Sequence, residues 1–308
     1  MQRLFRFGVV TERAQSHTEW RDKAKKAEDL GYATFLVPDH MEKDIAPVPA
    51  LMAAAEATST LRIGSFVFNN DLRQPTVLAK EVATLDLFSK GRFEFGLGAG
   101  YLPLDYDQTG VSFDSPATRI SRFEEALYLI KQLFREEEPV TFCGSFYTIK
   151  QAKGLPRPIQ KPHPPIYVGG GGIRVLSLAA READIVGFTP KNSLKGLDMS
   201  TATAGATKKK VEWVHAVAKE RFEHVELSCI VFRVIVTDNR VQAAQRAAGH
   251  TSLSVEQVLE SPHMLIGSVA QICEDLRARR ELYGISYIEI LEEYMELFAP
   301  VVARLAGT

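Results

Sequence analysis

Short apolar runs, rich in β-branched and aromatic residues, alternate along this chain with longer segments whose apolar residues recur at helical spacing. The apolar runs predict eight strands, over residues 5–10, 33–38, 61–68, 92–98, 166–168, 184–188, 225–236 and 285–291. The amphipathic segments predict helices over residues 18–31, 49–59, 75–89, 117–135, 174–183, 206–222, 241–250 and 268–284, with one more helix at the end. Because parallel strands must be joined by crossover connections, the alternation predicts an α/β fold with a parallel sheet.

The length of the chain favours closure of that sheet. Eight strand–helix repeats within 308 residues favour a (β/α)8 TIM barrel over an open doubly wound sheet. We therefore expect a single domain over residues 1–308. Two stretches interrupt the alternation and are expected to be insertions. Residues 139–165 combine a hairpin pattern with a proline-rich segment, and residues 189–205 read as a long polar loop that could serve as a lid.

Composition is that of a globular protein, with 45% hydrophobic and 24% charged residues. The net charge of −1 creates no global field that would attract nucleic acid or an anionic membrane. Cys143, Cys229 and Cys273 lie far apart, which gives no disulfide or metal framework and fits a reducing cytoplasm. The N-terminus lacks the apolar core of a signal peptide, and no apolar run approaches the ~20 residues of a membrane span. We expect a cytoplasmic protein that binds neither nucleic acid nor membrane.

In a (β/α)8 barrel the active site is built from the loops at the carboxyl ends of the strands. The chain has no HExxH or strand-one HxH metal motif and no GxSxG elbow, so no metal site is expected. A Schiff-base role for Lys191, or a glycosidase pair of Glu12 and Asp39, has little support. Few reactive groups, many glycines and one acid–histidine pair suit a site in which a bound cofactor supplies the chemistry.

Four consecutive glycines, Gly169 to Gly172, stand between a predicted strand and a predicted helix. Backbone N–H groups at a helix N-terminus can hold a phosphate, and the absence of side chains lets the anion approach. The alternative is tight strand–helix packing, which needs one or two glycines rather than four. The pattern GLGAG, Gly96 to Gly100, supports a flat ligand and close backbone packing equally.

Asp39 and His40 form the sharpest polar pair, directly after the second predicted strand. A turn aspartate beside an exposed histidine is the alternative interpretation. The position beyond a strand end favours a functional role, because histidine is the side chain best suited to move a proton near pH 7.

Several longer motifs resemble the bacterial-luciferase-like oxidoreductases, and within them the branch that uses the deazaflavin coenzyme F420. The similarity covers nearly the whole chain and rests on these segments: FLVPDH, LRIGSFVF, SKGRFEFGLGAGYLPLDYDQTGVSF, GLPRPIQKPHPPIYVGGGGIRVLSLAAREAD and LIGSVAQICEDLRARRELYGISYIEI. The motifs are more specific for the family than for the cofactor, since the family also contains flavin mononucleotide (FMN) enzymes.

The resemblance implies a (β/α)8 barrel with the cofactor ring in its mouth and the cofactor phosphate near the glycine run. It implies a non-prolyl cis peptide at Ser65–Phe66 and a catalytic role for His40. Where the sugar-phosphate dehydrogenases of this branch carry an acidic residue, this chain has Tyr101, so glucose 6-phosphate is not implied as substrate. Expected cofactor contacts are Asp39, Ser65, Phe66, Asn69, Gly98, Ala99, Gly100, Gly169, Gly170, Gly171, Gly172 and Thr189, and Glu12 is expected to contact substrate.

We therefore expect an oxidoreductase that moves a hydride between coenzyme F420 and a small organic substrate, either an alcohol or carbonyl compound or an activated C=C or C=N bond. His40 or Tyr101 would handle the proton. One alternative is an FMN-dependent two-component monooxygenase, and another is a flavin- or deazaflavin-binding protein without turnover. The resemblance also implies pairing into a homodimer.

Overall fold

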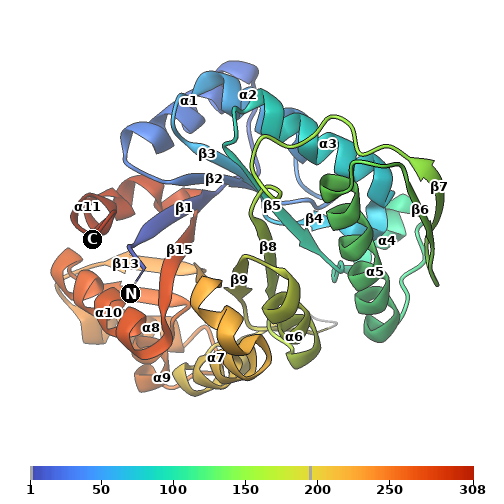
Figure 1. Cartoon of the computed structure of the whole chain (residues 1–308). Helices are drawn as coiled ribbons and strands as arrows, with labels where there is room; N and C mark the ends of the chain where they lie inside the picture. The colour runs from blue at the N-terminus through green and yellow to red at the C-terminus, as the bar shows by residue number, and fades with distance from the viewer. Residues whose placement is uncertain (1–2, 194–195) are drawn as a thin grey trace. The chain divides into compact units, whose positions relative to one another are not determined.

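The structure is a computed structural model that describes residues 3–193 and 196–308. All eight predicted strands are present in it (Figure 1). The strands that correspond to the prediction are β1 (Arg6–Val10), β2 (Thr34–Val37), β3 (Arg62–Ser65), β5 (Phe93–Gly98), β8 (Ile166–Gly170), β9 (Ile185–Phe188), β12 (Glu226–Val231) and β15 (Ile285–Leu291). A two-residue strand, β4 (Phe68–Asn69), follows β3.

The order of the hydrogen-bonded strands closes on itself. It runs β3-β2-β1-β15-β12-β9-β8-β5-β4, and β3 also pairs with β5. The pairings of β1 with β15, β12 with β15 and β9, and β5 with β3, β4 and β8 are parallel. The eight strands therefore form a closed parallel barrel, and the predicted TIM-barrel fold is confirmed.

The predicted helices are present, and two further helices, α4 and α9, were not predicted. Their bounds are α1 (His17–Asp29), α2 (Pro47–Ala57), α3 (Pro75–Phe88), α4 (Pro103–Thr109), α5 (Pro116–Arg135), α6 (Ile173–Glu182), α7 (Ala204–Ala218), α8 (Arg240–Ala248), α9 (Val255–Glu260), α10 (Val269–Tyr283) and α11 (Met295–Leu305). Prolines open α2, α3, α4 and α5, where the missing N–H costs nothing because the first turn has no intrahelical acceptor.

The chain divides into two compact units, which are described separately. The first comprises Met1–Thr11, Lys26–Phe35 and Val168–Thr308, and the second Glu12–Lys25 and Leu36–Tyr167. In the first unit β1, β15, β12 and β9 lie next to one another as parallel neighbours in the sheet, and α6 lies beside α7 (Figure 1). In the second unit β3, β5 and β4 pair, and α3 lies beside α5 (Figure 1). The single domain over residues 1–308 stays a prediction.

The two irregular stretches contain more regular structure than the sequence pattern indicates. The predicted hairpin in 139–149 is confirmed as the antiparallel pair β6 (Val140–Cys143) and β7 (Thr148–Ala152). The expectation of a loop over 189–205 was wrong in part, because it contains the antiparallel pair β10 (Lys191–Ser193) and β11 (Gly196–Asp198). Each strand has three residues and β10 is wholly polar, so the pair carries no recognisable alternation of apolar and polar positions. Residues 194–195 of this stretch lie outside the described residues.

The predicted strand over 225–236 is two strands. β12 ends at Val231, and β13 (Arg233–Val236) pairs with β14 (Met264–Gly267) instead of continuing the barrel ladder. The break has no signal in the sequence, because apolar residues dominate both halves, although β12 is almost wholly buried and β13 only in part.

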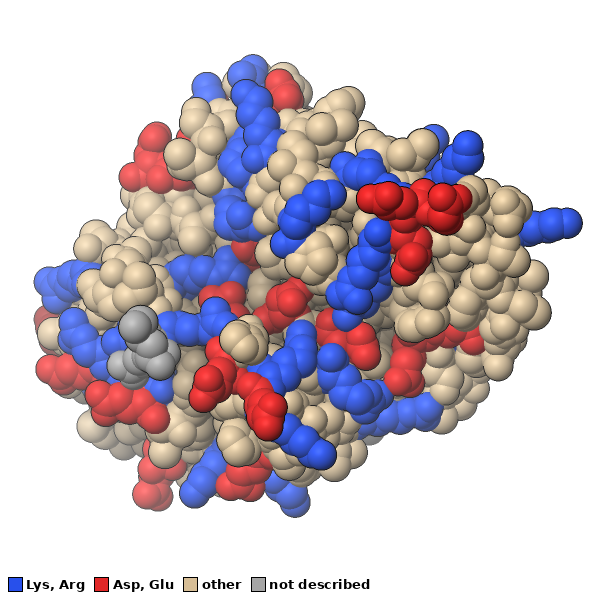
Figure 2. Space-filling view, in the orientation of Figure 1, with Lys and Arg blue, Asp and Glu red and all other residues tan. Residues whose placement is uncertain are grey.

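Surface charge agrees with the balanced composition. Basic and acidic side chains are interspersed on the face shown in Figure 2. Within residues 3–193 and 196–308, no helix has the length and apolar character needed to cross a membrane.

Candidate active site

His40 lies just beyond β2, where Pro38 and Asp39 lead out of the strand. Its Nδ1 atom is 2.8 Å from Oδ2 of Asp105, a residue in the first turn of α4. The side chain of Asp105 is 1% exposed and that of His40 is 19% exposed, so one edge of the ring is buried against a carboxylate. The backbone N–H of Met41 donates to the other carboxylate oxygen at 2.9 Å. Asp105 therefore holds both the ring and the backbone of this turn.

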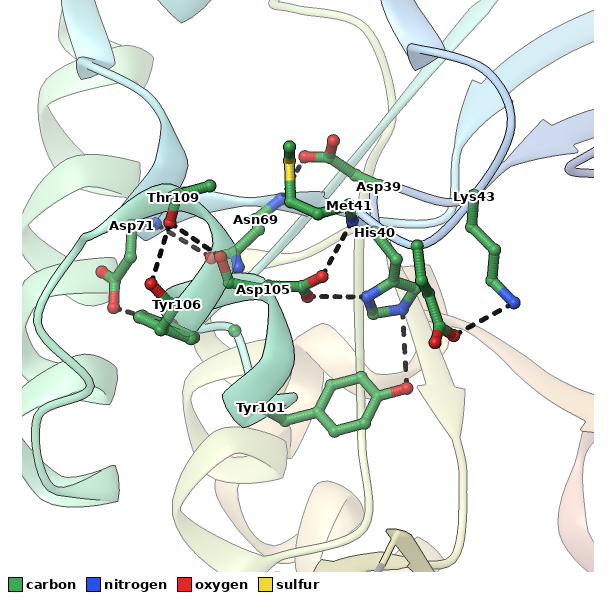
Figure 3. A network of polar contacts seen from close by, with 12 residues as sticks. Asp39, His40, Met41, Lys43, Asn69, Asp71, Tyr101, Asp105, Tyr106 and Thr109 are labelled. Carbon is green, nitrogen blue, oxygen red and sulfur yellow. Dashed lines mark hydrogen bonds and ion pairs between the residues drawn. The ribbon is translucent and has the colours of Figure 1, made fainter.

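Tyr101 lies on the opposite side of the imidazole (Figure 3). Its hydroxyl is 3.5 Å from Nε2 of His40, and the two rings meet edge to face with centroids 5.4 Å apart. Burial raises the pKa of Tyr101, and the negative charge of Asp105 raises it further. The phenol is therefore a neutral donor at physiological pH, beside the nitrogen of His40 that faces away from the carboxylate.

Glu12 forms an ion pair with Lys43, whose Nζ lies 2.9 Å from Oε1 of Glu12. The turn that presents Lys43 is closed by its N–H, which donates to the carbonyl of His40 at 3.2 Å. Burial opposes the charged form of Lys43, but Glu12 and Glu42 outweigh burial and raise the pKa of the amine. The predicted substrate contact Glu12 is thus placed beside the His40 turn with its charge balanced, and its role toward substrate stays a prediction.

Asp39 points away from His40 and holds the neighbouring strand end. Its carboxylate forms an ion pair with Arg73 and accepts the N–H of Asn69 at 2.9 Å. The Asn69 side chain in turn accepts the N–H of Asp71 at 3.0 Å. Asp39 and Asn69 are therefore brought together as structural partners, and direct cofactor contacts by them stay predictions.

The cis peptide expected at Ser65–Phe66 is one position further on, at Phe66–Val67, so this expectation was wrong. Ser65 still belongs to β3, and its hydroxyl bridges the N–H and carbonyl groups of Gly96 in β5. The β3–β5 pairing runs to Gly64 and Glu94, the Ser65 side chain then contacts Gly96, and the cis peptide follows before β4 starts at Phe68.

Packing accounts for the glycines at the end of β5 and just after it. A Cβ atom on Gly98 would lie 2.7 Å from the Val67 side chain. Gly100 has φ +68°, and a Cβ atom there would lie 2.0 Å from the Tyr106 hydroxyl. The close-packing interpretation of GLGAG is thus sufficient, and cofactor contacts by Gly98, Ala99 and Gly100 stay predictions.

The glycines of the run Gly169–Gly172 differ in the space around them. A Cβ atom on Gly170 would lie 2.4 Å from the Val175 side chain, and one on Gly171 would lie 2.5 Å from the Pro190 carbonyl oxygen. Gly172 has no atom within 4 Å of that position. It is the N-cap of α6, and no side chain caps the helix there. Packing thus requires Gly170 and Gly171, whereas Gly172 leaves the positive end of a ten-residue helix open.

Thr189 lies beside this run, since its N–H donates to the carbonyl of Gly170 at 3.1 Å. The carbonyl of Thr189 accepts from the buried Lys210, whose Nζ is 2.6 Å away and also contacts the Thr201 carbonyl at 3.1 Å. Burial lowers the pKa of Lys210 to about 8. The lysine therefore joins Thr189, in the segment that follows β9, to Thr201, while Thr189 itself is bonded to Gly170.

Sequence reasoning missed Asp105, Lys43 and Lys210. Asp105 lies in a seven-residue helix that has too few turns to show an apolar period, and Pro103 at its start was the available signal. Lys210 belongs to the run Lys208–Lys210, which reads as a solvated helix face although its last member is 1% exposed.

A cavity of about 590 Å³ lies elsewhere in the second unit. It is lined in part by Arg73, Arg122 and Asp114, and none of the predicted site residues lines it. Both arginines are ion-paired, Arg73 with Asp39 and Arg122 with Asp71 and Asp114. Within the described residues no group of three or more His, Cys, Asp or Glu could hold a metal ion.

Comparison with known proteins settles the family. The family model for luciferase-like monooxygenases matches residues 4–297. The chain belongs to the luciferase-like monooxygenase family. An F420-dependent glucose-6-phosphate dehydrogenase from Kineococcus radiotolerans is 35% identical to this luciferase-like chain over 190 residues. That match covers 59% of this chain and 54% of the dehydrogenase. The chain thus aligns with about half the length of the curated relatives it matches.

Solved structures show the same fold. An F420-dependent secondary alcohol dehydrogenase in complex with an F420–acetone adduct superposes with a TM-score of 0.79 at 17% identity, covering 98% of this chain and 99% of the other. The coenzyme F420-dependent tetrahydromethanopterin reductase from Methanopyrus kandleri gives 0.77 at 20% identity, covering 98% and 100%. A long-chain alkane monooxygenase gives 0.79 at 15% identity, covering 99% and 92%.

Proposed function

We propose that this luciferase-like protein is an F420-dependent oxidoreductase that interconverts a small secondary alcohol and its carbonyl compound. The observation that carries the proposal is the placement of the Tyr101 hydroxyl beside Nε2 of His40, at the end of β2. Histidine and tyrosine are suited to give and take a proton at a substrate oxygen. The named relatives that use F420 support the choice of cofactor and of an alcohol as substrate.

The residues fit a cofactor with an anionic tail. Gly172 leaves open space at the uncapped N-terminus of α6, where backbone N–H groups favour a phosphate. Gly170 and Thr189 form the hydrogen-bonded backbone beside it. When bound, the deazaflavin would accept or donate the hydride at its C5 atom.

The proton is the part of the reaction that this chain supplies. In the oxidative direction, Nε2 of His40 takes the proton from the alcohol oxygen, and the bound deazaflavin would accept the hydride from carbon, which leaves a ketone. In the reductive direction, the same proton returns from Nε2 of His40 to the oxygen, while the Tyr101 phenol donates a hydrogen bond to the developing alkoxide. The 3.5 Å between the phenol oxygen and Nε2 exceeds the ~2.8 Å typical of a hydroxyl donor, so a substrate oxygen competes well for the hydrogen bond of the phenol. The same arrangement serves reduction of an activated C=C or C=N bond.

A panel of secondary alcohols tests the proposal directly. Wild-type protein should reduce oxidised F420 with at least one alcohol, measured as a decrease in the absorbance of the oxidised cofactor, and His40→Gln should remove that activity. A matched control is His17→Gln, which alters an exposed histidine in α1. If F420 binds but neither alcohols nor reducible carbonyl, enone and imine substrates react, the protein is a binder without turnover and the proposal is wrong.

An FMN-dependent monooxygenase is the second candidate. The fold is shared with a long-chain alkane monooxygenase, and the family model carries that name. Oxygen consumption by the protein with reduced FMN, in excess of free reduced FMN alone, would favour this candidate. Pairing of two chains and a cytoplasmic location rest on the resemblance and composition and stay predictions.

A further inference from the structure

We propose that Asp105 is a positioning residue that holds His40 as its Nδ1–H tautomer and so keeps the Nε2 lone pair directed toward Tyr101. This inference rests on the proposed function and deepens it, because it states how the proton acceptor of that site is prepared. Asp105 itself touches neither substrate nor cofactor in this scheme. It acts through the ring of His40.

The contact geometry leaves one role for each atom. A carboxylate can only accept hydrogen bonds, so Nδ1 at 2.8 Å from Oδ2 must carry the proton of that contact. Oδ1 is already engaged by the Met41 N–H at 2.9 Å. A neutral imidazole has a single N–H, and once Nδ1 holds it, Nε2 must be the acceptor. The hydroxyl of Tyr101 is the group that lies next to that acceptor.

The carboxylate is held rigidly enough to impose this choice. Its side chain is 1% exposed, so water does not compete for the contact with His40. Met41 is the residue after His40, so Asp105 binds the ring and the adjoining backbone of the same turn. The next residue in α4, Tyr106, donates to Asp71 at 3.0 Å and fixes the helix on its other side.

The arrangement has a catalytic consequence in both directions. With Nδ1–H fixed, Nε2 can take a proton from a substrate hydroxyl, and the buried carboxylate stabilises the imidazolium that forms. With the opposite tautomer, Nε2 would present a hydrogen to the substrate and could not act as a base. A purely structural role for Asp105 would predict that the tautomer of His40 does not depend on this carboxylate.

Asp105→Asn separates these accounts. The side-chain carbonyl introduced by this substitution can still accept the hydrogen bond from the Met41 N–H. Its NH2 group then donates to Nδ1 of His40, so that Nδ1 must be unprotonated. The substitution therefore favours the Nε2–H tautomer of His40. Nitrogen-15 NMR of uniformly labelled protein at a pH where His40 is neutral reports the tautomer, with the His40 signals assigned by their loss in His40→Gln. We expect a protonated Nδ1 in the wild type and a protonated Nε2 in Asp105→Asn. A protonated Nε2 in the wild type, or an unchanged tautomer in the variant, would overturn the proposal.

Kinetics supply the second arm. Asp105→Asn should lower kcat about a hundredfold or more, while KM and the F420 dissociation constant change less than about threefold. Asp107→Asn, the same substitution at an exposed position in α4, should leave kcat unchanged. Asp105→Glu should restore the Nδ1–H tautomer and part of kcat, which keeps the test valid if Asp105→Asn folds poorly. Equal loss of kcat in Asp107→Asn would contradict the proposal.

The two arms also separate this inference from the proposed function. The NMR measurement needs no cofactor, substrate or turnover. If no alcohol or reducible substrate reacts but the tautomer depends on Asp105, the proposed function fails and the positioning role stands. If turnover is observed but the tautomer ignores Asp105, the positioning role fails alone.

Discussion

The carboxylate of Asp105 lies 2.8 Å from Nδ1 of His40, although the two residues are 65 positions apart in the sequence. One follows the second strand of the barrel, and the other lies in the first turn of the short helix after β5. The fold thus builds an acid–histidine pair that the sequence does not display, since the adjacent Asp39 binds Arg73 instead. Tyr101 lies at the remaining nitrogen of the ring.

His40→Gln should lower kcat by about a hundredfold to ten-thousandfold, because the proton acceptor is lost. Binding of F420 should change little, since the ring of His40 is assigned to proton transfer rather than to the cofactor. Steady-state kinetics and a fluorescence titration on the same preparation give both quantities. A variant that retains more than about a tenth of the wild-type kcat would contradict the role of His40.

Tyr101→Phe should lower kcat/KM for carbonyl reduction and for alcohol oxidation by the same factor, because the phenol stabilises the same alkoxide-like transition state in both directions. Burial and the charge of Asp105 raise the pKa of Tyr101, so its loss of a proton begins above the ordinary value near 10. Wild-type reduction should therefore show no activity loss from this group below about pH 10. Measurements of kcat/KM in both directions across pH 6–10 provide the check, and an unchanged kcat/KM in the variant would speak against Tyr101 as hydrogen-bond donor.

Gly172→Asp should weaken F420 binding about tenfold or more without destabilising the fold. An aspartate N-cap satisfies the first turn of α6 and repels an anionic tail at the same point. The same deazaflavin without its phosphate tail should bind both proteins equally. Gly205→Asp places the same charge in the first turn of α7, also at a glycine with open space, and should have no effect on F420. Equal weakening by both variants would argue against a tail site at Gly172.

Lys210→Met should lower the free energy of unfolding by about 1–3 kcal/mol, because the carbonyls of Thr189 and Thr201 lose a buried donor. Burial lowers the pKa of Lys210 to about 8, below its unfolded value near 10.5. The unfolded state then binds more protons between these values, so Lys210 makes wild-type stability rise with pH from about 8 to 10.5. Denaturant unfolding at pH 8 and 10 should show a smaller rise in Lys210→Met, and an unchanged rise in the exposed control Lys208→Met.

Glu289→Gln should change how stability depends on pH. The Glu289 side chain is buried in β15, its Oε1 accepts from Ser228, and within the described residues Oε2 has no hydrogen-bond partner. Burial raises its pKa to about 8, while Ser228 and Arg6 act in the opposite direction.

Because the folded pKa lies above the unfolded one, Glu289 contributes stability below about pH 4.5 that is lost as pH rises to about 8. The loss approaches about 1.4 kcal/mol per pH unit for one group. Urea unfolding at pH 5 and 8 should show that the free energy of unfolding of Glu289→Gln increases relative to that of the wild type as pH rises. Glu220→Gln, at an exposed position, should have the same pH dependence as the wild type. Parallel curves for Glu289→Gln and the wild type would refute the assignment.

The barrel could be predicted because its strands and helices carry strong local patterns. Each barrel strand is an apolar run, and each of the longer helices has several turns over which the apolar period repeats. The break between β12 and β13 could not be predicted, because both halves are apolar and only pairing with β14 separates them. The antiparallel pair β10–β11 is largely polar, so its strands have no hydrophobic signature.

The grouping of the candidate residues could be predicted where position along the chain decides it. His40, Tyr101 and Glu12 follow strand ends, where the barrel rule places an active site, and their roles stay predictions. Asp105 depends on how α4 is placed against the His40 turn, which is a tertiary relationship without a local signal. For the glycines, the sequence pattern indicated more ligand contacts than the structure requires. Packing against Val67, Val175 and Pro190 explains Gly98, Gly170 and Gly171, whereas Gly172 has open space where a side chain would lie.

Titration of the purified protein with F420 and with FMN, each oxidised and reduced, measures which cofactor this chain binds. We predict tight, saturable binding of F420 with a change in its fluorescence, and binding of FMN at least about tenfold weaker. Preference for reduced FMN, or binding of neither cofactor, would contradict it.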